Sequence, residues 1–142
     1  MKHMPSLASV MTPFPQAIDY GDDLQAAASM MERKASVQLP VIRKGDLVGI
    51  VTARDLEAVR AVVPKSVNSW TVGDVAERDP YVVDIGARLD AVVKTMSTRR
   101  ATTALVTREG KLVGILTAAN ACALLARVLV EAFPPPEDDQ VA

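Results

Sequence analysis

The apolar positions of this chain follow two periods, and the periods occur in the same order twice. Two stretches carry apolar side chains at the i, i+3, i+4 and i+7 spacing of a helix with one buried face. They are Leu24, Ala27, Ala28 and Met31 in one half, and Leu89, Val92, Val93 and Met96 in the other. A short extended segment precedes each helix, at residues 16–18 and 81–83, and two apolar runs joined by a glycine-containing turn follow it. With a last helix after Thr52 and after Thr117, each half predicts the order strand, helix, strand, strand, helix.

The two halves are also related in sequence. A shift of 65 residues aligns positions 10–55 with positions 75–120 without a gap, and 16 of the 46 aligned pairs are identical. Such an alignment indicates a tandem duplication. One copy, at about 60 residues, would be only marginally stable alone. We therefore expect an α+β protein in which two βαββα repeats pack face to face about a pseudo-two-fold axis.

The expected boundaries follow from the turn-forming and helix-breaking residues. The first repeat is expected over residues 7–63 and the second over residues 72–133. Between them, residues 64–71 begin with a proline and contain several turn formers, which is typical of a linker. Three prolines end the last helix, and the acidic tail at residues 134–142 is expected to be disordered.

Composition narrows the class of protein. The chain has 142 residues, of which 49% are hydrophobic and 23% charged, with a formal net charge of −1. No apolar stretch reaches the length of a membrane span, and the balanced charge disfavours a nucleic-acid binder that relies on bulk positive charge. A single cysteine and a single histidine leave no disulfide, metal cluster or nucleophile–base set. We expect a cytoplasmic binding protein with no metal and no catalytic cofactor, and not an enzyme.

The junction between the last strand and the last helix of each repeat concentrates polar side chains. It reads GIVTARD at residues 49–55 and GILTAAN at residues 114–120. One interpretation is purely structural. The threonine accepts from the backbone N–H three residues on, and Asp55 or Asn120 reaches back to the N–H of the threonine. Taken singly, either motif is explained by helix capping.

The same atoms would also suit a nucleotide. A helix N-terminus attracts phosphate, a threonine hydroxyl can donate to a phosphate or sugar oxygen, and the Asp55 carboxylate can accept from both ribose hydroxyls. Arg54 would add charge for a phosphate. Flat apolar segments around Ile18 and Val83 would hold a purine ring between them. Because the repeat is duplicated, two such clefts are expected.

Together these segments resemble the CBS domain, and the chain resembles a CBS pair over residues 7–133. The matching segments are VMTPFP at residues 10–15, LPVI at residues 39–42, and the two junctions GIVTARD and GILTAAN. Their order and their repetition at one spacing carry the resemblance. It implies βαββα repeats that associate through their sheets. It also implies two clefts that often hold an adenine nucleotide (AMP, ADP or ATP) or another adenosyl ligand.

The resemblance further implies which residues bind. In such modules the threonine and aspartate of the junction hold ribose and phosphate, and the segment after the proline lies against the adenine. Carried onto the first repeat of this chain, the candidates are Thr12, Pro15, Ala17, Ile18, Thr52, Arg54 and Asp55. In the second repeat they are Pro80, Val82, Val83, Thr117, Ala119 and Asn120.

The second repeat departs from the family pattern at two places. Residues 76–78 read Ala-Glu-Arg where the first repeat has Met-Thr-Pro, and Asn120 replaces the carboxylate. We expect weaker ribose binding by Asn120, and repulsion of phosphate by Glu77 and Asp79 near the same cleft. The Asp55 motif is the more complete of the two. Because each cleft borrows from both repeats, which whole cleft binds better stays open.

The last helix indicates a partner. Residues 121–133 are apolar around more than one face, which favours a homodimer formed through the helices, with an unidentified protein as another partner. The basic pairs at residues 33–34 and 99–100 are interpreted as solvated helix ends in preference to a phosphate clamp or an RNA-contacting patch. The leading hypothesis is a regulatory module that senses an adenosine-containing ligand. The alternative is a dimerisation or docking scaffold with vestigial clefts.

Overall fold

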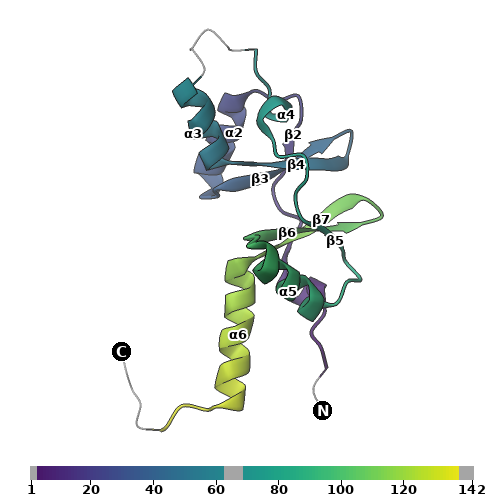
Figure 1. The fold of residues 1–142 in the computed structure, drawn as a ribbon, viewed down its shortest axis with the longest axis vertical. Helices are drawn as coiled ribbons and strands as arrows, with labels where there is room; N and C mark the ends of the chain where they lie inside the picture. The colour runs from purple at the N-terminus through teal and green to yellow at the C-terminus, as the bar shows by residue number, and fades with distance from the viewer. Residues whose placement is uncertain (1–2, 63–68, 138–142) are drawn as a thin grey trace.

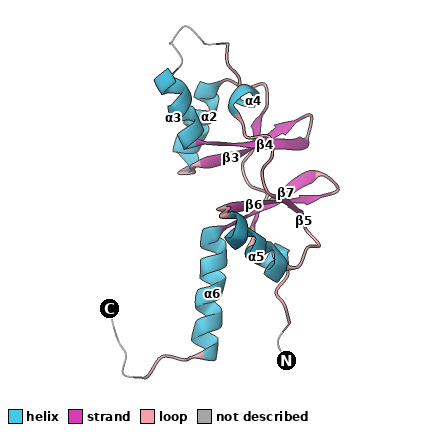
Figure 2. Cartoon of the chain, in the orientation of Figure 1, coloured by secondary structure: helices cyan, strands magenta, loops and turns pink. Residues whose placement is uncertain are grey.

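The structure is a computed structural model that describes residues 3–62 and 69–137. The molecule is elongated, with two sheets stacked along its long axis (Figure 1). The strands meet near the middle and the helices lie toward the two ends (Figure 2). The last helix, α6 (Ala118–Ala132), extends away from the lower sheet. This arrangement confirms the predicted α+β architecture of two sheets with helices on their outer sides.

The upper sheet belongs to the first repeat. It has the order β2 (Ile18–Asp19), β3 (Gln38–Arg43), β4 (Asp46–Thr52), with β2 parallel to β3 and β3 antiparallel to β4. Helices α2 (Leu24–Lys34) and α3 (Ala53–Val62) pack beside it. The helical spacing of the sequence is confirmed, because Ala27 and Met31 are the buried residues of α2.

The lower sheet repeats this order. Strand β5 (Val82–Asp84) is parallel to β6 (Thr103–Arg108), which is antiparallel to β7 (Lys111–Thr117), and α5 (Leu89–Arg99) and α6 complete the repeat. Strands β2 and β5 begin slightly later than the extended segments expected at residues 16–18 and 81–83. Both hairpins turn at a Lys-Gly or Glu-Gly pair in which both residues have positive φ, the geometry for which glycine is selected.

Each repeat has its own apolar core, and a third cluster joins them. The upper core is built around Ile18, Ala27, Met31, Leu39, Val41, Val51 and Leu56, and the lower one around Leu89, Val92, Met96, Ala104, Val106 and Leu116. Between the sheets, Ile50 of β4 packs with Leu105 and Ile115 of the second repeat. Burial of this contact removes apolar surface of both sheets from water and stabilises the pair over either repeat alone.

The repeats exchange their first helices. Helix α1 (Leu7–Val10) inserts Leu7 into the lower core, and β1 (Thr12–Pro13) pairs antiparallel with β7, so the lower sheet has the order β1-β7-β6-β5. Conversely, α4 (Val72–Val75) buries Val72 in the upper core. Each packing unit therefore takes its first helix from the other repeat. Residues 63–68, most of the expected linker, and residues 138–142 of the expected tail lie outside the described residues.

Candidate functional site

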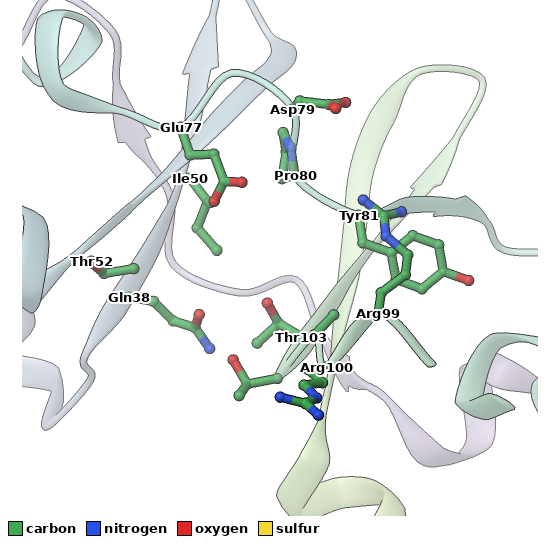
Figure 3. A pocket seen from close by; sticks show the side chains of 12 residues that line it. Gln38, Ile50, Thr52, Glu77, Asp79, Pro80, Tyr81, Arg99, Arg100 and Thr103 are labelled. Carbon is green, nitrogen blue, oxygen red and sulfur yellow. The ribbon is translucent and has the colours of Figure 1, made fainter. Parts of the chain in front are cut away.

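A polar cleft lies between the two repeats, with a volume of about 300 Å³ (Figure 3). We call it the Thr52 cleft. It is lined by Gln38, Ile50, Thr52, Glu77, Asp79, Pro80, Tyr81, Arg99, Arg100, Ala101, Thr102 and Thr103. A volume of this size is at the lower end of the range for small-molecule sites. The cleft therefore combines the end of the first repeat's hairpin with two segments of the second repeat.

Glu77, which lines one side of this cleft, is held by backbone hydrogen bonds to Ile50. Glu77 N donates to Ile50 O at 2.8 Å, and Ile50 N donates to Glu77 O at 3.0 Å, which holds the segment against β4 at one point. The chain then runs through Pro80 to Tyr81, whose carbonyl accepts from Leu105 N of β6 at 2.9 Å. The segment thus passes from one sheet to the other, and the cleft lies beside this crossing.

The two strand–helix junctions form the capping boxes that the sequence predicts. Thr52 Oγ1 accepts from Asp55 N at 3.1 Å, and Asp55 Oδ2 accepts from Thr52 N at 3.0 Å. The same bonds join Thr117 and Asn120 at 3.0 and 2.9 Å. Capping is therefore confirmed as one role of these residues. Thr52 Oγ1 is turned toward the start of α3 by its bond to Asp55 N, and the methyl group of Thr52 points into the cleft (Figure 3).

Charge is distributed unevenly around the Thr52 cleft. Glu77 and Asp79 lie on one side of the opening, and Arg100 lies on the opposite side (Figure 3). The Arg99 guanidinium lies over the Tyr81 ring, 5.0 Å from its centroid, a cation–π contact that holds the charge beside the cleft. The cleft can therefore accept hydrogen bonds from a ligand at one end and donate them at the other.

A second hollow of about 400 Å³ adjoins the cleft through the residues the two share, Asp79, Pro80, Tyr81 and Arg99. Its other lining residues include Val82 and Arg78. The Arg78 side chain is held in place, since it donates to the Tyr20 hydroxyl at 3.2 Å and to Gly73 O at 3.1 Å. The adjoining hollow gives space for a ligand larger than the Thr52 cleft alone.

Of the residues predicted from sequence, the structure brings a few to this cleft. Thr52 and Pro80 line it, and Val82 lines the adjoining hollow. Asp55 caps α3 behind Thr52, and Arg54 is exposed on α3 without lining the cleft. Thr12, Pro15, Ala17, Thr117, Ala119 and Asn120 lie outside the residues that line it.

Two placements differ from expectation. The Ile18 side chain is 1% exposed and packs in the upper core, and Val83 packs against the lower core, so neither presents its side chain to a purine in this cleft. Glu77 and Asp79, expected beside Asn120, lie instead with Thr52. The reason is the exchange of segments between the repeats. Glu77 pairs with Ile50 of β4 in the first repeat, while Thr12 pairs with β7 in the second.

Sequence reasoning missed Gln38, Tyr81 and residues 99–103. For the pair Arg99-Arg100, the sequence favours a solvated helix end over a phosphate clamp. Only the tertiary structure shows that the end of α5 faces Thr52 across the two repeats. Within residues 3–62 and 69–137, no group of three or more His, Cys, Asp or Glu side chains could hold a metal ion.

A model of the CBS domain matches residues 7–61 and again residues 72–127. The chain belongs to the CBS domain family. This CBS pair is 32% identical over 116 residues to the uncharacterized protein YlbB of Bacillus subtilis, which covers 80% of this chain and 78% of YlbB. CBS pairs are in general regulatory modules and not enzymes. No helix in the described part of this pair is long and apolar enough to cross a bilayer.

Solved structures show the same fold. A structure described as an acetoin utilization protein, AcuB, from Vibrio cholerae superposes with a TM-score of 0.81 at 23% identity, over 94% of this chain and all of that chain. CBSX2, solved in complex with AMP, superposes with a TM-score of 0.75 at 25% identity, over 87% of this chain and 97% of that chain. The tandem arrangement of this CBS pair is thus shared with other proteins over almost its whole length.

Proposed function

We propose that this CBS pair is a regulatory module that binds an adenosine-containing ligand in the Thr52 cleft. One observation carries the proposal: Gln38 and Thr52 of the first repeat converge on one hollow with a Pro-Tyr segment and two arginines of the second repeat. The complex of CBSX2 with AMP supports the ligand class, since that protein shares this fold. AMP, ADP, ATP and other adenosyl compounds are the candidates.

The position of the cleft suggests how binding would regulate. A ligand in the cleft would contact β4 of the first repeat and the end of α5 in the second. It would therefore stabilise the relative packing of the two repeats in which both elements contact the ligand. The contact between Asp46 and Lys111, at 2.7 Å, joins the tips of the two hairpins and is exposed, so it adds little to hold this arrangement. The ligand would therefore bias the packing of the repeats, and a partner would read the change.

A thermal-unfolding screen tests the proposal. At 100 times its Kd, a ligand that binds only the folded chain raises the free energy of unfolding by about 2.7 kcal/mol, which is several degrees in a chain of this size. We expect such a shift with at least one of AMP, ADP, ATP, adenosine and S-adenosylmethionine. Inorganic phosphate at the same ionic strength is the control for a general anion effect. No shift with any adenosyl compound would rule the proposal out.

The exposed face of α6 favours dimerisation as a second candidate function. Leu125, Val128, Leu129 and Val130 are exposed on this helix, and Phe133 is exposed directly after it. Beside them, a groove of about 470 Å³ runs between α6, α5 and the Met4-Pro5 segment, and its lining is mainly apolar. One helix thus offers both an apolar ridge and an apolar groove, which suits a second copy of this chain related by a two-fold axis.

Oligomeric state tests this second candidate. Leu129→Glu places a charge on the ridge and is expected to convert a dimer into a monomer in light scattering, with an unchanged circular dichroism spectrum. Arg127→Glu changes charge on the same helix outside the groove lining and is the control. A monomer for the unmodified chain at high micromolar concentration would contradict dimerisation through α6.

A further inference from the structure

We infer that the Thr52 cleft selects a 5′-phosphorylated adenosine ligand over uncharged adenosine, and that the chain binds one such ligand and not two. This inference rests on the proposed function and sharpens it, because it names the charge of the ligand and the cleft that takes it. It follows from a comparison of the two clefts that the duplication would generate.

Arg100 is the residue that distinguishes the Thr52 cleft. Both repeats end their central helix with a residue in the left-handed conformation, Ala35 at φ 50° after α2 and Arg100 at φ 55° after α5. Glycine or asparagine is usual at this position, because these residues adopt the left-handed conformation most readily, and the conformation does not require a long side chain. The conformation is thus a property of the fold, while the guanidinium at residue 100 is particular to the second repeat and lines the cleft.

Arg100 and the acidic residues give the ligand a direction. Arg100 places a positive charge at one end of the cleft, where a phosphate would form charge-assisted hydrogen bonds, and Arg99 adds a second charge to the lining beside Tyr81 (Figure 3). Glu77 and Asp79, on the opposite side from Arg100 (Figure 3), accept hydrogen bonds only, which suits ribose hydroxyls or the adenine amino group. A nucleoside without phosphate would leave the arginine end without its partner.

The positions around Thr117 that the duplication makes equivalent carry different chemistry. Lys34 and Ala35 are equivalent to Arg99 and Arg100, and Asn120 stands where the first junction has Asp55. The segment at residues 12–14, which is equivalent to residues 77–79, also pairs with its neighbouring strand over more residues. Thr12 and Pro13 pair with β7, and Phe14 N donates to Val113 O at 2.9 Å.

The equivalent segment of the Thr52 cleft behaves differently. Glu77 forms a single isolated bridge with Ile50, and the chain then crosses to the other sheet. Where that segment has Asp79, the counterpart has Phe14, whose side chain is 80% exposed. The positions around Thr117 that are equivalent in sequence therefore carry one lysine, an amide and a phenyl ring, so they have one cation where the Thr52 cleft has two and no carboxylate to accept from a ribose.

Calorimetric titration of the full chain with AMP and with adenosine tests the inference. We expect AMP to bind at least tenfold more tightly than adenosine, with one AMP per chain. Arg100→Ala copies the residue found at position 35 and is expected to weaken AMP binding about tenfold or more while leaving adenosine binding within twofold. Lys34→Ala is the matched control and is expected to leave both within twofold. Arg100→Lys, which keeps the charge, is expected to recover part of the AMP affinity.

The outcomes separate this inference from the proposed function. If no adenosyl compound binds, the proposed function fails and the inference with it. If adenosine binds as tightly as AMP, or two AMP molecules bind per chain, the inference fails while the proposed function stands. Equal losses of AMP affinity in Arg100→Ala and Lys34→Ala would also overturn it. Thermal unfolding of each variant, expected within 2 °C of the unmodified chain, shows that a lost affinity is not a lost fold.

Discussion

Gly49→Ala is expected to lower the free energy of unfolding by about 3 kcal/mol and to abolish ligand binding in the Thr52 cleft. A Cβ at residue 49 would lie 2.4 Å from the carbonyl oxygen of Glu77, well inside van der Waals contact. That carbonyl accepts from Ile50 N, so relief of the clash requires Glu77 to leave β4 and to break the bridge that opens the cleft. Overpacking of this kind typically costs 1–3 kcal/mol, and more where backbone must move.

The duplication supplies a matched control in Gly114→Ala. At this equivalent glycine, a Cβ would meet the Met11 side chain, whose nearest atom is Sδ. A methionine side chain has several rotatable bonds and can turn aside, whereas the carbonyl of Glu77 cannot. In urea unfolding we expect Gly114→Ala to cost less than half as much as Gly49→Ala. Equal losses would show that the pairing of Glu77 with β4 does not control the packing there.

Leu7→Ala is expected to destabilise the chain by 2–5 kcal/mol, although residue 7 lies at the very start of the first repeat. Leu7 is 1% exposed and packs with Leu89, Val92 and Leu116, all in the second repeat. Truncation leaves a cavity that the surrounding sheet and helix fill only in part. Because α1 belongs to the first repeat and packs in the core of the second, we expect the substitution to lower the free energy of unfolding of the whole pair.

Urea unfolding monitored by circular dichroism measures this loss. Val37→Ala is the control, since Val37 is exposed on the first repeat and its truncation is expected to change stability by less than 0.5 kcal/mol. A Leu7→Ala variant as stable as the control would contradict the exchange of first helices, because it would mean that α1 does not pack in the lower core.

The sequence was sufficient for the elements of each repeat. Leu24, Ala27 and Met31 carry the helical period of α2, and the glycines of the two hairpins stand where positive φ is required. These are local properties, so an alignment of the two halves predicts them without knowledge of the rest of the fold. The capping pairs Thr52–Asp55 and Thr117–Asn120 were predicted for the same reason.

The exchange of segments and the composition of the cleft could not be predicted in the same way. Leu7 and Val72 are both apolar, and an apolar residue satisfies either core, so the sequence does not decide which repeat each helix covers. Thr52 and Arg100 line the same cleft although they belong to different repeats. Their proximity depends on how the sheets face one another, a tertiary contact that no local pattern encodes.

A crystal structure of the chain grown with AMP tests the central claim most directly. We predict density for one AMP per chain in the Thr52 cleft, with its phosphate within hydrogen-bond distance of the Arg100 guanidinium and its ribose or adenine on the side of Glu77. Density for AMP beside Thr117, or an empty Thr52 cleft at an AMP concentration of several millimolar, would contradict it.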